Sequence, residues 1–122
     1  MKGIGIDMIE VDRVAEKIGK ESGFREMVFS AEEIRYCEPK ANMAEHYAAR
    51  FAAKEAFFKA IGTGWKNGTA FNEIEIRHGD QGAPQLFLLG ETARTLSAMN
   101  IQKIHVSLSH LKSIASAVVV VE

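Results

Sequence analysis

Hydrophobic and polar positions alternate at the start of the chain with the period of a β-strand. Isoleucine or methionine occupies every second position from Ile4 to Met8, while glycine or aspartate stands between them from Gly3 to Asp7. The side chains of a strand point alternately to its two faces. We therefore predict a strand over residues 2–9, one face of which is almost bare of side chains.

A helical spacing of apolar residues follows this strand. Its stripe consists of Val11, Val14, Ala15 and Ile18. This spacing predicts a helix that Asp12 caps. Ser30 and Glu33 have the spacing of a capping box, and Pro39 disfavours helix just before it, so we predict a short helix over residues 31–37.

The longest helical pattern begins at Asn42 and continues to about Ile61, where Gly62-Thr63-Gly64 favours a left-handed C-terminal cap. Alternating positions in the second half predict further strands, mainly antiparallel, with a modest helix among them. These strands cover residues 71–78, 85–89, 104–109 and 114–121, and the helix covers residues 90–100. We find no internal repeat or linker, so we expect one α+β domain over residues 1–122, with a mainly antiparallel sheet packed against a long central helix and shorter helices.

Composition limits the classes of function. The chain has 122 residues, 47% of them hydrophobic and 25% charged, which is the balance of a globular protein. Its net charge of −1 gives no general attraction to nucleic acid or to an anionic membrane. The single cysteine, Cys37, allows neither an internal disulfide nor a cysteine-based zinc site. The first ten residues lack the apolar core of a signal peptide, and the longest apolar run, Ala117 to Val121, is far shorter than a membrane span. We expect a cytoplasmic protein.

Asp7 is the first candidate for chemistry. Aspartate is disfavoured within a strand, and the neighbouring glycines would let a ligand approach the backbone. The alternative is that Asp7 is an edge-strand charge that discourages aggregation.

The segment from Arg50 to Lys59 is the second candidate. Glu55 and Lys59 are four residues apart and share a helix face, as do Arg50 and Lys54. The alternative is an ordinary surface pair of Glu55 and Lys59, worth about 0.2–0.5 kcal/mol. The interleaved phenylalanines and alanines instead indicate that some of these charges lie near the apolar boundary, where electrostatic interactions are stronger.

Two other patterns carry less weight. Gly62-Thr63-Gly64 follows a helix, and the partial negative charge of a helix C-terminus repels phosphate, so it is not a phosphate loop. His105, Ser107 and Ser109 share a strand face with no group to orient a serine nucleophile. Hydrogen bonding to a polar ligand is a more credible role for them than hydrolysis.

Taken together, the motifs resemble those of the acyl-carrier-protein synthase family, the small phosphopantetheinyl transferases. The segment from Gly3 to Arg13 looks like the N-terminal motif of that family. Arg50 to Ala60, with Gly62-Thr63-Gly64, looks like its central signature. Gly82-Ala83-Pro84 and Val106 to His110 follow in the expected order, so the resemblance runs nearly from end to end.

The resemblance implies the 4′-phosphopantetheinyl transferase fold and a reaction. The phosphopantetheine arm of coenzyme A would pass to a serine of apo acyl carrier protein, releasing adenosine 3′,5′-bisphosphate, in support of fatty acid biosynthesis. Asp7 and Glu55 match the ligands of a magnesium ion, and Lys59 is placed to stabilise the leaving group. Either Glu55 or a metal-bound water could receive the serine proton.

The resemblance also implies residues that bind coenzyme A and the carrier protein. The expected coenzyme A contacts are Arg50, Lys59, Gly62, Thr63, Gly64, Gly82, Pro84 and His110. Near Lys40 to Asn42, many relatives have extra basic residues that help to hold the nucleotide, and this chain departs from that pattern. The expected contacts with the acidic carrier protein are Arg13, Lys17, Lys20, Phe24 and Arg25. Nearby glutamates dilute this basic strip, so a solvated face of mixed charge is the alternative.

Members of the family are typically homotrimers with sites between subunits, which suits a chain too small to enclose coenzyme A alone. Two other functions compete with the transferase. One is a metal-dependent phosphohydrolase that uses Asp7 and Glu55 on one ion with water as the nucleophile. The other is a non-catalytic module that binds an acidic protein through its basic helix.

Overall fold

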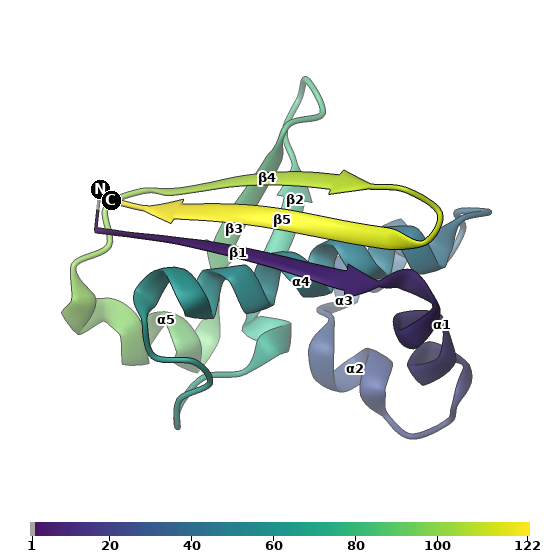
Figure 1. Ribbon diagram of the computed structural model, residues 1–122. Helices are drawn as coiled ribbons and strands as arrows, with labels where there is room; N and C mark the ends of the chain where they lie inside the picture. Colours follow the sequence, from purple (N-terminus) through teal and green to yellow (C-terminus); the bar gives the residue numbers. More distant parts are fainter. Residues whose placement is uncertain (1) are drawn as a thin grey trace.

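The computed structural model describes residues 2–122 (Figure 1). The α-helices are α1 (Val11–Gly19), α2 (Phe24–Val28), α3 (Ala31–Cys37), α4 (Met43–Ile61) and α5 (Gly90–Leu96), and two 3-10 turns are η1 (Phe71–Glu73) and η2 (Ser97–Met99). The strands are β1 (Gly3–Glu10), β2 (Ile74–His78), β3 (Pro84–Leu88), β4 (Ile104–His110) and β5 (Ile114–Val121). The predicted α+β class is confirmed.

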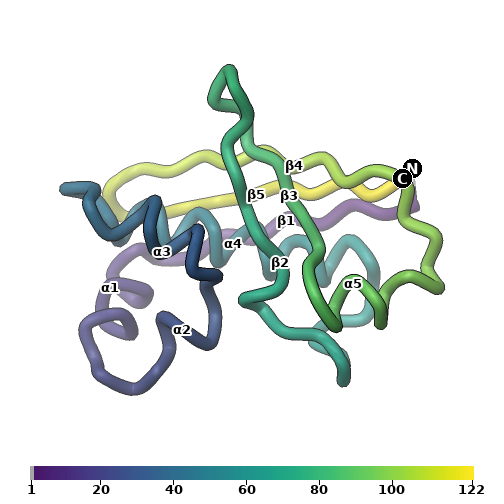
Figure 2. The backbone as a smooth tube through the Cα atoms, turned by 180° about the vertical axis from the view of Figure 1, so that it is seen from behind, coloured from purple at the N-terminus to yellow at the C-terminus, as the bar shows by residue number. Residues whose placement is uncertain are grey.

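The strands form two antiparallel groups. A three-stranded sheet has the order β1-β5-β4, and β2 pairs with β3 as a separate hairpin. Asp7 lies opposite Ala117 near the middle of the β1–β5 pair. Figure 2 shows the hairpin crossing the direction of the sheet strands, with its tip projecting beyond them. The two chain ends meet at one end of the sheet, where the Lys2 amide donates to the Val121 carbonyl over 2.7 Å.

The bare face of β1 is covered by α4. A Cβ atom added to Gly3 would lie 1.9 Å from the Ala60 carbonyl oxygen, and one added to Gly5 would lie 2.0 Å from the Ala56 carbonyl oxygen. The glycines therefore permit a helix, and not a ligand, to approach the strand backbone, which corrects the expectation from the sequence. This close contact fixes which part of α4 faces Asp7.

Small and aromatic side chains make the core around α4. Ala52, Ala56 and Phe57 pack with Ile74 of the hairpin and Val119 of β5 in one cluster. A second cluster joins the first half of α4 to α1, α2 and α3, and it contains Val14, Phe29, Cys37, Tyr47 and Ala48. Because α4 is buried on most sides, charged residues on it are either paired in the core or directed to the few open positions.

Several element ends differ from the prediction. Strand β1 runs directly into α1, so Glu10 holds the N-cap position and Asp12 lies in the first turn. Ala15, predicted within the apolar stripe, is exposed. Residues 71–73 form a turn before β2, and the helix predicted over residues 90–100 ends as α5 at Leu96 and continues as η2. The short helix α2 has too few residues to show a periodic pattern.

Two predicted helix ends are confirmed. Ser30 and Glu33 form the reciprocal bonds of a capping box at the start of α3. Gly62 follows α4 with a φ of 77°, the left-handed conformation that ends a helix. Across residues 2–122, no helix is both long enough and apolar enough to cross a bilayer.

Candidate active site

Asp7 and Lys59 meet where β1 packs on α4. Lys59 Nζ lies 3.0 Å from Asp7 Oδ1 and also donates to the Ile6 carbonyl oxygen over 3.0 Å. The Asp7 side chain is only 17% exposed, while that of Lys59 is 56% exposed. The glycine contacts of β1 place Asp7 on the face that α4 covers, so its carboxylate is directed at the helix by the alternation of the strand.

Glu55 completes this cluster one helical turn before Lys59. Its side chain is half-buried, and burial is the main cause that raises its pKa above the usual range. The negative charge of Asp7 raises the pKa further, whereas Lys59 and Lys17 lower it. Asp7 and Glu55 are therefore close enough to repel each other, and the sharing of one metal ion by the two carboxylates stays a prediction.

Asp7 and Glu55 fit a magnesium ion by the chemistry of their donor atoms. Mg²⁺ is typically held by one or two carboxylates, with waters and phosphate oxygens filling its other positions. No group of three histidine, cysteine, aspartate or glutamate side chains in residues 2–122 forms a cage for a metal. Two half-buried carboxylates that repel each other are stabilised by a dication between them.

A second cluster lies on another face of α4. A cavity of about 200 Å³ is lined by His46, Ala49, Arg50, His78, Gly82, Pro84, Leu108 and His110. Four of the residues predicted to bind coenzyme A, Arg50, Gly82, Pro84 and His110, are therefore brought together here. They come from α4, the β2–β3 hairpin and β4.

Arg50 is the central cation of this cavity. It is 2% exposed, its Nε atom has no hydrogen-bond partner in the described chain, and its Nη1 atom donates only to the His46 carbonyl oxygen over 3.5 Å. The guanidinium lies 4.3 Å from the ring centre of Tyr36. A buried guanidinium without a carboxylate partner is costly unless an anion satisfies it.

The predicted contacts Gly62, Thr63 and Gly64 lie elsewhere. They follow the C-terminal end of α4 and are exposed, about 18 Å along the helix from Arg50 at 1.5 Å per residue. Glu55 is rotated about 140° from Arg50 around the same helix. The chain therefore presents two separate groups, with Asp7, Glu55, Lys59 and the glycine loop in one and the Arg50 cavity in the other.

Sequence reasoning missed His46, His78 and Tyr36 at the Arg50 cavity. Tyr36 stacks on His78 with ring centres 4.9 Å apart. His46 precedes Arg50 by four residues, and this helical spacing was a usable signal. His78 and Tyr36 come from other elements, so no sequence spacing relates them to Arg50.

The predicted carrier-protein contacts divide into two sets. Arg13 and Lys17 are exposed on α1, and the exposed Lys20 directly follows the helix and pairs with Glu16 over 3.3 Å. Phe24 is half-buried against Phe29 and Phe51.

The remaining contact, Arg25, is partly buried. Its Nε atom lies 3.2 Å from Glu38 Oε2. The exposed part of the predicted surface is thus α1 itself, and Phe24 and Arg25 mainly support it from beneath.

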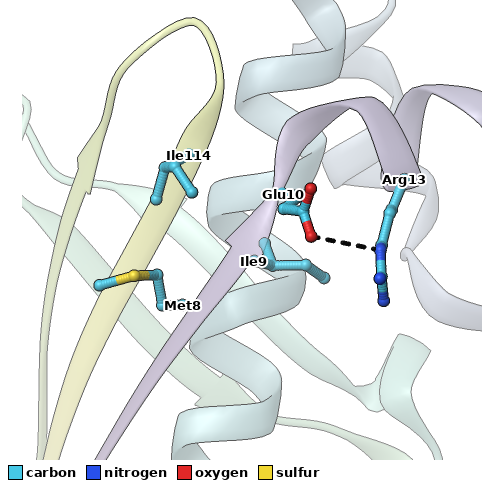
Figure 3. A pocket seen from close by; sticks show the side chains of 5 residues that line it. All are labelled: Met8, Ile9, Glu10, Arg13 and Ile114. Atoms are coloured by element: carbon cyan, nitrogen blue, oxygen red, sulfur yellow. Dashed lines mark ion pairs between the residues drawn. The ribbon is translucent and has the colours of Figure 1, made fainter.

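A pocket of about 380 Å³ lies at the junction of β1 and α1, next to Asp7 in the chain. Figure 3 shows Met8 and Ile114 on one side of it and the Glu10–Arg13 pair on the other. Arg13 Nε lies 3.4 Å from Glu10 Oε1, and both side chains are largely exposed. A pair of this kind is weak and exchanges readily for another acidic group.

Comparison with known proteins agrees with the fold. The model of the 4′-phosphopantetheinyl transferase superfamily matches residues 3–118. A holo-[acyl-carrier-protein] synthase of Syntrophus aciditrophicus is 45% identical over 121 residues, which make up 98% of this chain and 94% of the relative.

Solved structures give the same result. The holo-[acyl-carrier-protein] synthase of Neisseria meningitidis superposes with a TM-score of 0.90 at 30% identity, covering 100% of this chain and 98% of that one. The Helicobacter pylori protein of the same name, solved in complex with coenzyme A, superposes with a TM-score of 0.84 at 33% identity, covering 98% of this chain and 99% of that one. The chain belongs to the 4′-phosphopantetheinyl transferase superfamily and is an enzyme of that family. The resemblance read from its motifs is confirmed.

Proposed function

We propose that this enzyme transfers the 4′-phosphopantetheine group of coenzyme A to a serine hydroxyl of an apo acyl carrier protein. The serine oxygen forms a bond to the phosphorus that carries the pantetheine arm. The bond from that phosphorus to the bridging oxygen of the pyrophosphate breaks, and adenosine 3′,5′-bisphosphate leaves with the bridging oxygen. The serine proton passes to a base.

The observation that carries this proposal is the meeting of Asp7, Glu55 and Lys59 across the β1–α4 contact. Lys59 lies 3.0 Å from Asp7 Oδ1, is still half exposed, and can neutralise charge on a leaving bisphosphate. Asp7 and Glu55 would hold Mg²⁺, which when bound neutralises the pyrophosphate. Burial raises the pKa of Glu55 above its usual range, which makes this carboxylate a better acceptor for the serine proton than an ordinary glutamate.

The Arg50 cavity supports coenzyme A as the donor. Its guanidinium is buried with an unpartnered Nε, and the hairpin residues Gly82 and Pro84 form the opposite wall. An anionic nucleotide satisfies this donor without a protein carboxylate. The relative from Helicobacter pylori was solved with coenzyme A, and Arg50, Gly82, Pro84 and His110 are the contacts that we propose here.

We further propose that the working enzyme is a homotrimer with sites between subunits. The face of the sheet that α4 does not cover exposes Ile4, Ile6 and Met8, which are 58%, 60% and 66% exposed. Ile4 and Ile6 lie beside Val120 and Val118 in the sheet register. Such a contiguous apolar face is typical of an interface between subunits. Assembly would also bring the Asp7 group of one subunit toward the Arg50 cavity of a neighbour, which a single subunit does not do.

The acceptor docks, in this proposal, on α1. Arg13, Lys17 and Lys20 form an exposed basic strip, and Lys17 is near enough to Glu55 to lower its pKa. An acidic carrier protein bound there places its serine near the catalytic carboxylates. The setting that we propose is the cytoplasm, in fatty acid biosynthesis.

Intact-mass spectrometry tests the proposal directly. The protein is incubated with coenzyme A, Mg²⁺ and an apo acyl carrier protein, and the carrier should gain the mass of one phosphopantetheine. Release of nucleotide without modification of the carrier would favour a phosphohydrolase, and binding of the carrier without any chemistry would favour a non-catalytic module. Asp7→Asn and Glu55→Gln should abolish transfer, while Glu91→Gln, at an exposed position on α5, should not.

A further inference from the structure

Three histidines from three different elements line the Arg50 cavity. His46 belongs to α4, His78 to β2 and His110 to β4. The His46 and His110 ring centres are 5.4 Å apart. The ring of Tyr36 contacts both His46 and His78, with centre-to-centre distances of 5.7 Å and 4.9 Å. A second cavity, of about 370 Å³, shares Arg50 and His78 with the first. The three imidazoles thus line the same cavity as the unpartnered guanidinium.

Hydrogen bonds within the chain fix which ring nitrogen is left for a ligand. His78 Nδ1 lies 2.8 Å from the Gly82 carbonyl oxygen, and His110 Nδ1 lies 2.9 Å from Glu45 Oε1. Both partners are acceptors, so Nδ1 donates in each case and carries the hydrogen. The Nε2 atom of a neutral ring is then an acceptor, and protonation converts it into a donor. Only the protonated ring suits a phosphate oxygen.

The charges around the three rings are of both signs. The cations are Arg50, Lys40 and Arg77, and the anions are Glu45, Glu32, Glu75 and Asp80. Arg35 neutralises Glu32 within α3, His110 binds Glu45, and Glu75 pairs with Arg77, so Arg50 is the buried cation to which none of these carboxylates is paired. Tyr36 and the buried Cys37 are neutral partners, because burial raises the pKa of the Cys37 thiol to about 11. Arg50 is the only one of the cations that is fully buried.

His46 links the binding of a ligand to the uptake of a proton. Its pKa is lowered, first by burial and then by the nearby charges of Arg50, His110 and Lys40. The ring therefore stays neutral at a pH where an ordinary histidine begins to charge. A bound phosphate reverses the local field, which favours the imidazolium.

Resting on the proposed function, in which this cavity receives the nucleotide of coenzyme A, we propose that His46 and His78 are additional anion-binding residues. They take up protons when a phosphate group binds, so the affinity of the cavity for phosphate-bearing nucleotides rises as pH falls. Tyr36 holds His78 and Arg50 in place by stacking on both.

Calorimetry of nucleotide binding tests this inference. Adenosine 3′,5′-bisphosphate is titrated into the assembled protein at pH 6, 7 and 8, in two buffers of different ionisation enthalpy. We expect proton uptake on binding at pH 6 to 7. The nucleotide titrates in this range too, so the informative quantity is the ratio of dissociation constants between variant and wild type at each pH.

The double variant His46→Gln and His78→Gln should weaken binding roughly tenfold at pH 6 and by less than about twofold at pH 8, since one unit of pKa shift on binding corresponds to a tenfold change in affinity. Arg94→Gln is the control, because Arg94 is exposed on α5 and lines neither cavity. Adenosine, which carries no phosphate, should show no difference between the proteins. If the double variant is unstable, the single variant His78→Gln, at an exposed position, replaces it in the test.

Equal dissociation constants for wild type and double variant at pH 6 would overturn the inference and leave the transferase proposal intact. Absence of nucleotide binding by the wild type at every pH would instead refute the proposed donor, and this inference with it. The two failures are therefore distinguishable.

Discussion

Lys54 Nζ lies 2.7 Å from Glu33 Oε1, and neither side chain has any exposed area. Lys54 also donates to the backbone oxygens of Phe71 and Ile74, while Glu33 Oε2 accepts from the Ile76 amide over 3.0 Å. One buried ion pair thus joins α3, α4 and the start of β2. These elements carry Tyr36, Arg50 and His78, so the pair sets the geometry of the Arg50 cavity without touching it.

Lys54→Met should therefore destabilise the protein strongly. The substitution keeps most of the aliphatic stem but leaves the Glu33 carboxylate buried without its counter-charge, at a cost of about 3–5 kcal/mol. Urea denaturation measures the free energy of unfolding. The exposed Lys112→Met serves as the control and should change it by less than about 0.5 kcal/mol. A Lys54→Met protein as stable as the control would mean that the pair is not a structural junction.

Gly5→Ala should disrupt the contact between β1 and α4. The new methyl group would lie 2.0 Å from the Ala56 carbonyl oxygen, so the strand and the helix must separate, which costs roughly 3 kcal/mol and moves Asp7 away from Glu55. Gly19→Ala is the matched variant, because nothing lies within 4 Å of its new Cβ. It should be neutral or stabilising by about 0.5–1 kcal/mol. In thermal denaturation, the melting temperature should therefore fall for Gly5→Ala and stay unchanged or rise for Gly19→Ala.

Lys59→Met should raise the pKa of Glu55 further. Burial and Asp7 already raise this pKa, and Lys59 opposes them. Folded Glu55 keeps its proton to a higher pH than the unfolded chain does, so its ionisation lowers stability as pH rises through that interval, and the variant widens the interval. A carbon-detected NMR titration of the Glu55 carboxyl measures the change. Lys103→Met, an exposed lysine outside the site, should leave the titration where it was; no difference between the two variants would show that Lys59 does not act on Glu55.

Reversing the charges on α1 should weaken use of the carrier protein selectively. Arg13→Glu with Lys17→Glu replaces two exposed cations by anions that repel an acidic partner, and we expect KM for the carrier to rise tenfold or more, with KM for coenzyme A nearly unchanged. Lys103→Glu reverses a charge at the opposite end of the sheet and should leave both constants unaltered. Steady-state kinetics at two salt concentrations measure both constants. An equal rise in KM for the carrier protein and for coenzyme A would argue against docking on α1.

Ile6→Glu should prevent assembly. The side chain is 60% exposed in one subunit and lies in the middle of the apolar sheet face, so a carboxylate there would be buried in the interface without a partner. Native mass spectrometry should give a trimer for the wild type and a monomer for the variant, with unchanged far-UV circular dichroism. Met27→Glu changes an apolar residue that is 65% exposed on α2 and should remain a trimer. A wild type that is monomeric at working concentration would rule out sites between subunits.

Much of the candidate site could be predicted because its motifs are local. The Ser30 capping box and the Gly62 helix end depend on residues within one turn, and both form as the sequence indicates. Glu55 and Lys59 share a face because helix geometry requires it. The place of Asp7 on the glycine face of β1 follows in the same way from the alternation of a strand.

The sequence of β1 does not show what covers its glycine face. The spacing of Gly3, Gly5 and Asp7 is compatible with a bound ligand and with a packed helix, and the tertiary structure selects the helix. The same holds for the charges on α4, where Arg50 faces an open cavity and Lys54 meets Glu33 from another helix. Side-chain periodicity gives the direction of each residue but not the element that it meets.

The sequence alone therefore determined most of the elements and the family, and it suggested the residues proposed for the reaction, since these depend on backbone preferences and motifs within a few residues of one another. Only the tertiary structure decided that Asp7 meets Lys59, that His46, His78 and His110 line one cavity with Arg50, and that these two groups lie apart on α4. Such pairings join residues distant in the chain, and their geometry is set by how helices and strands pack against a common core.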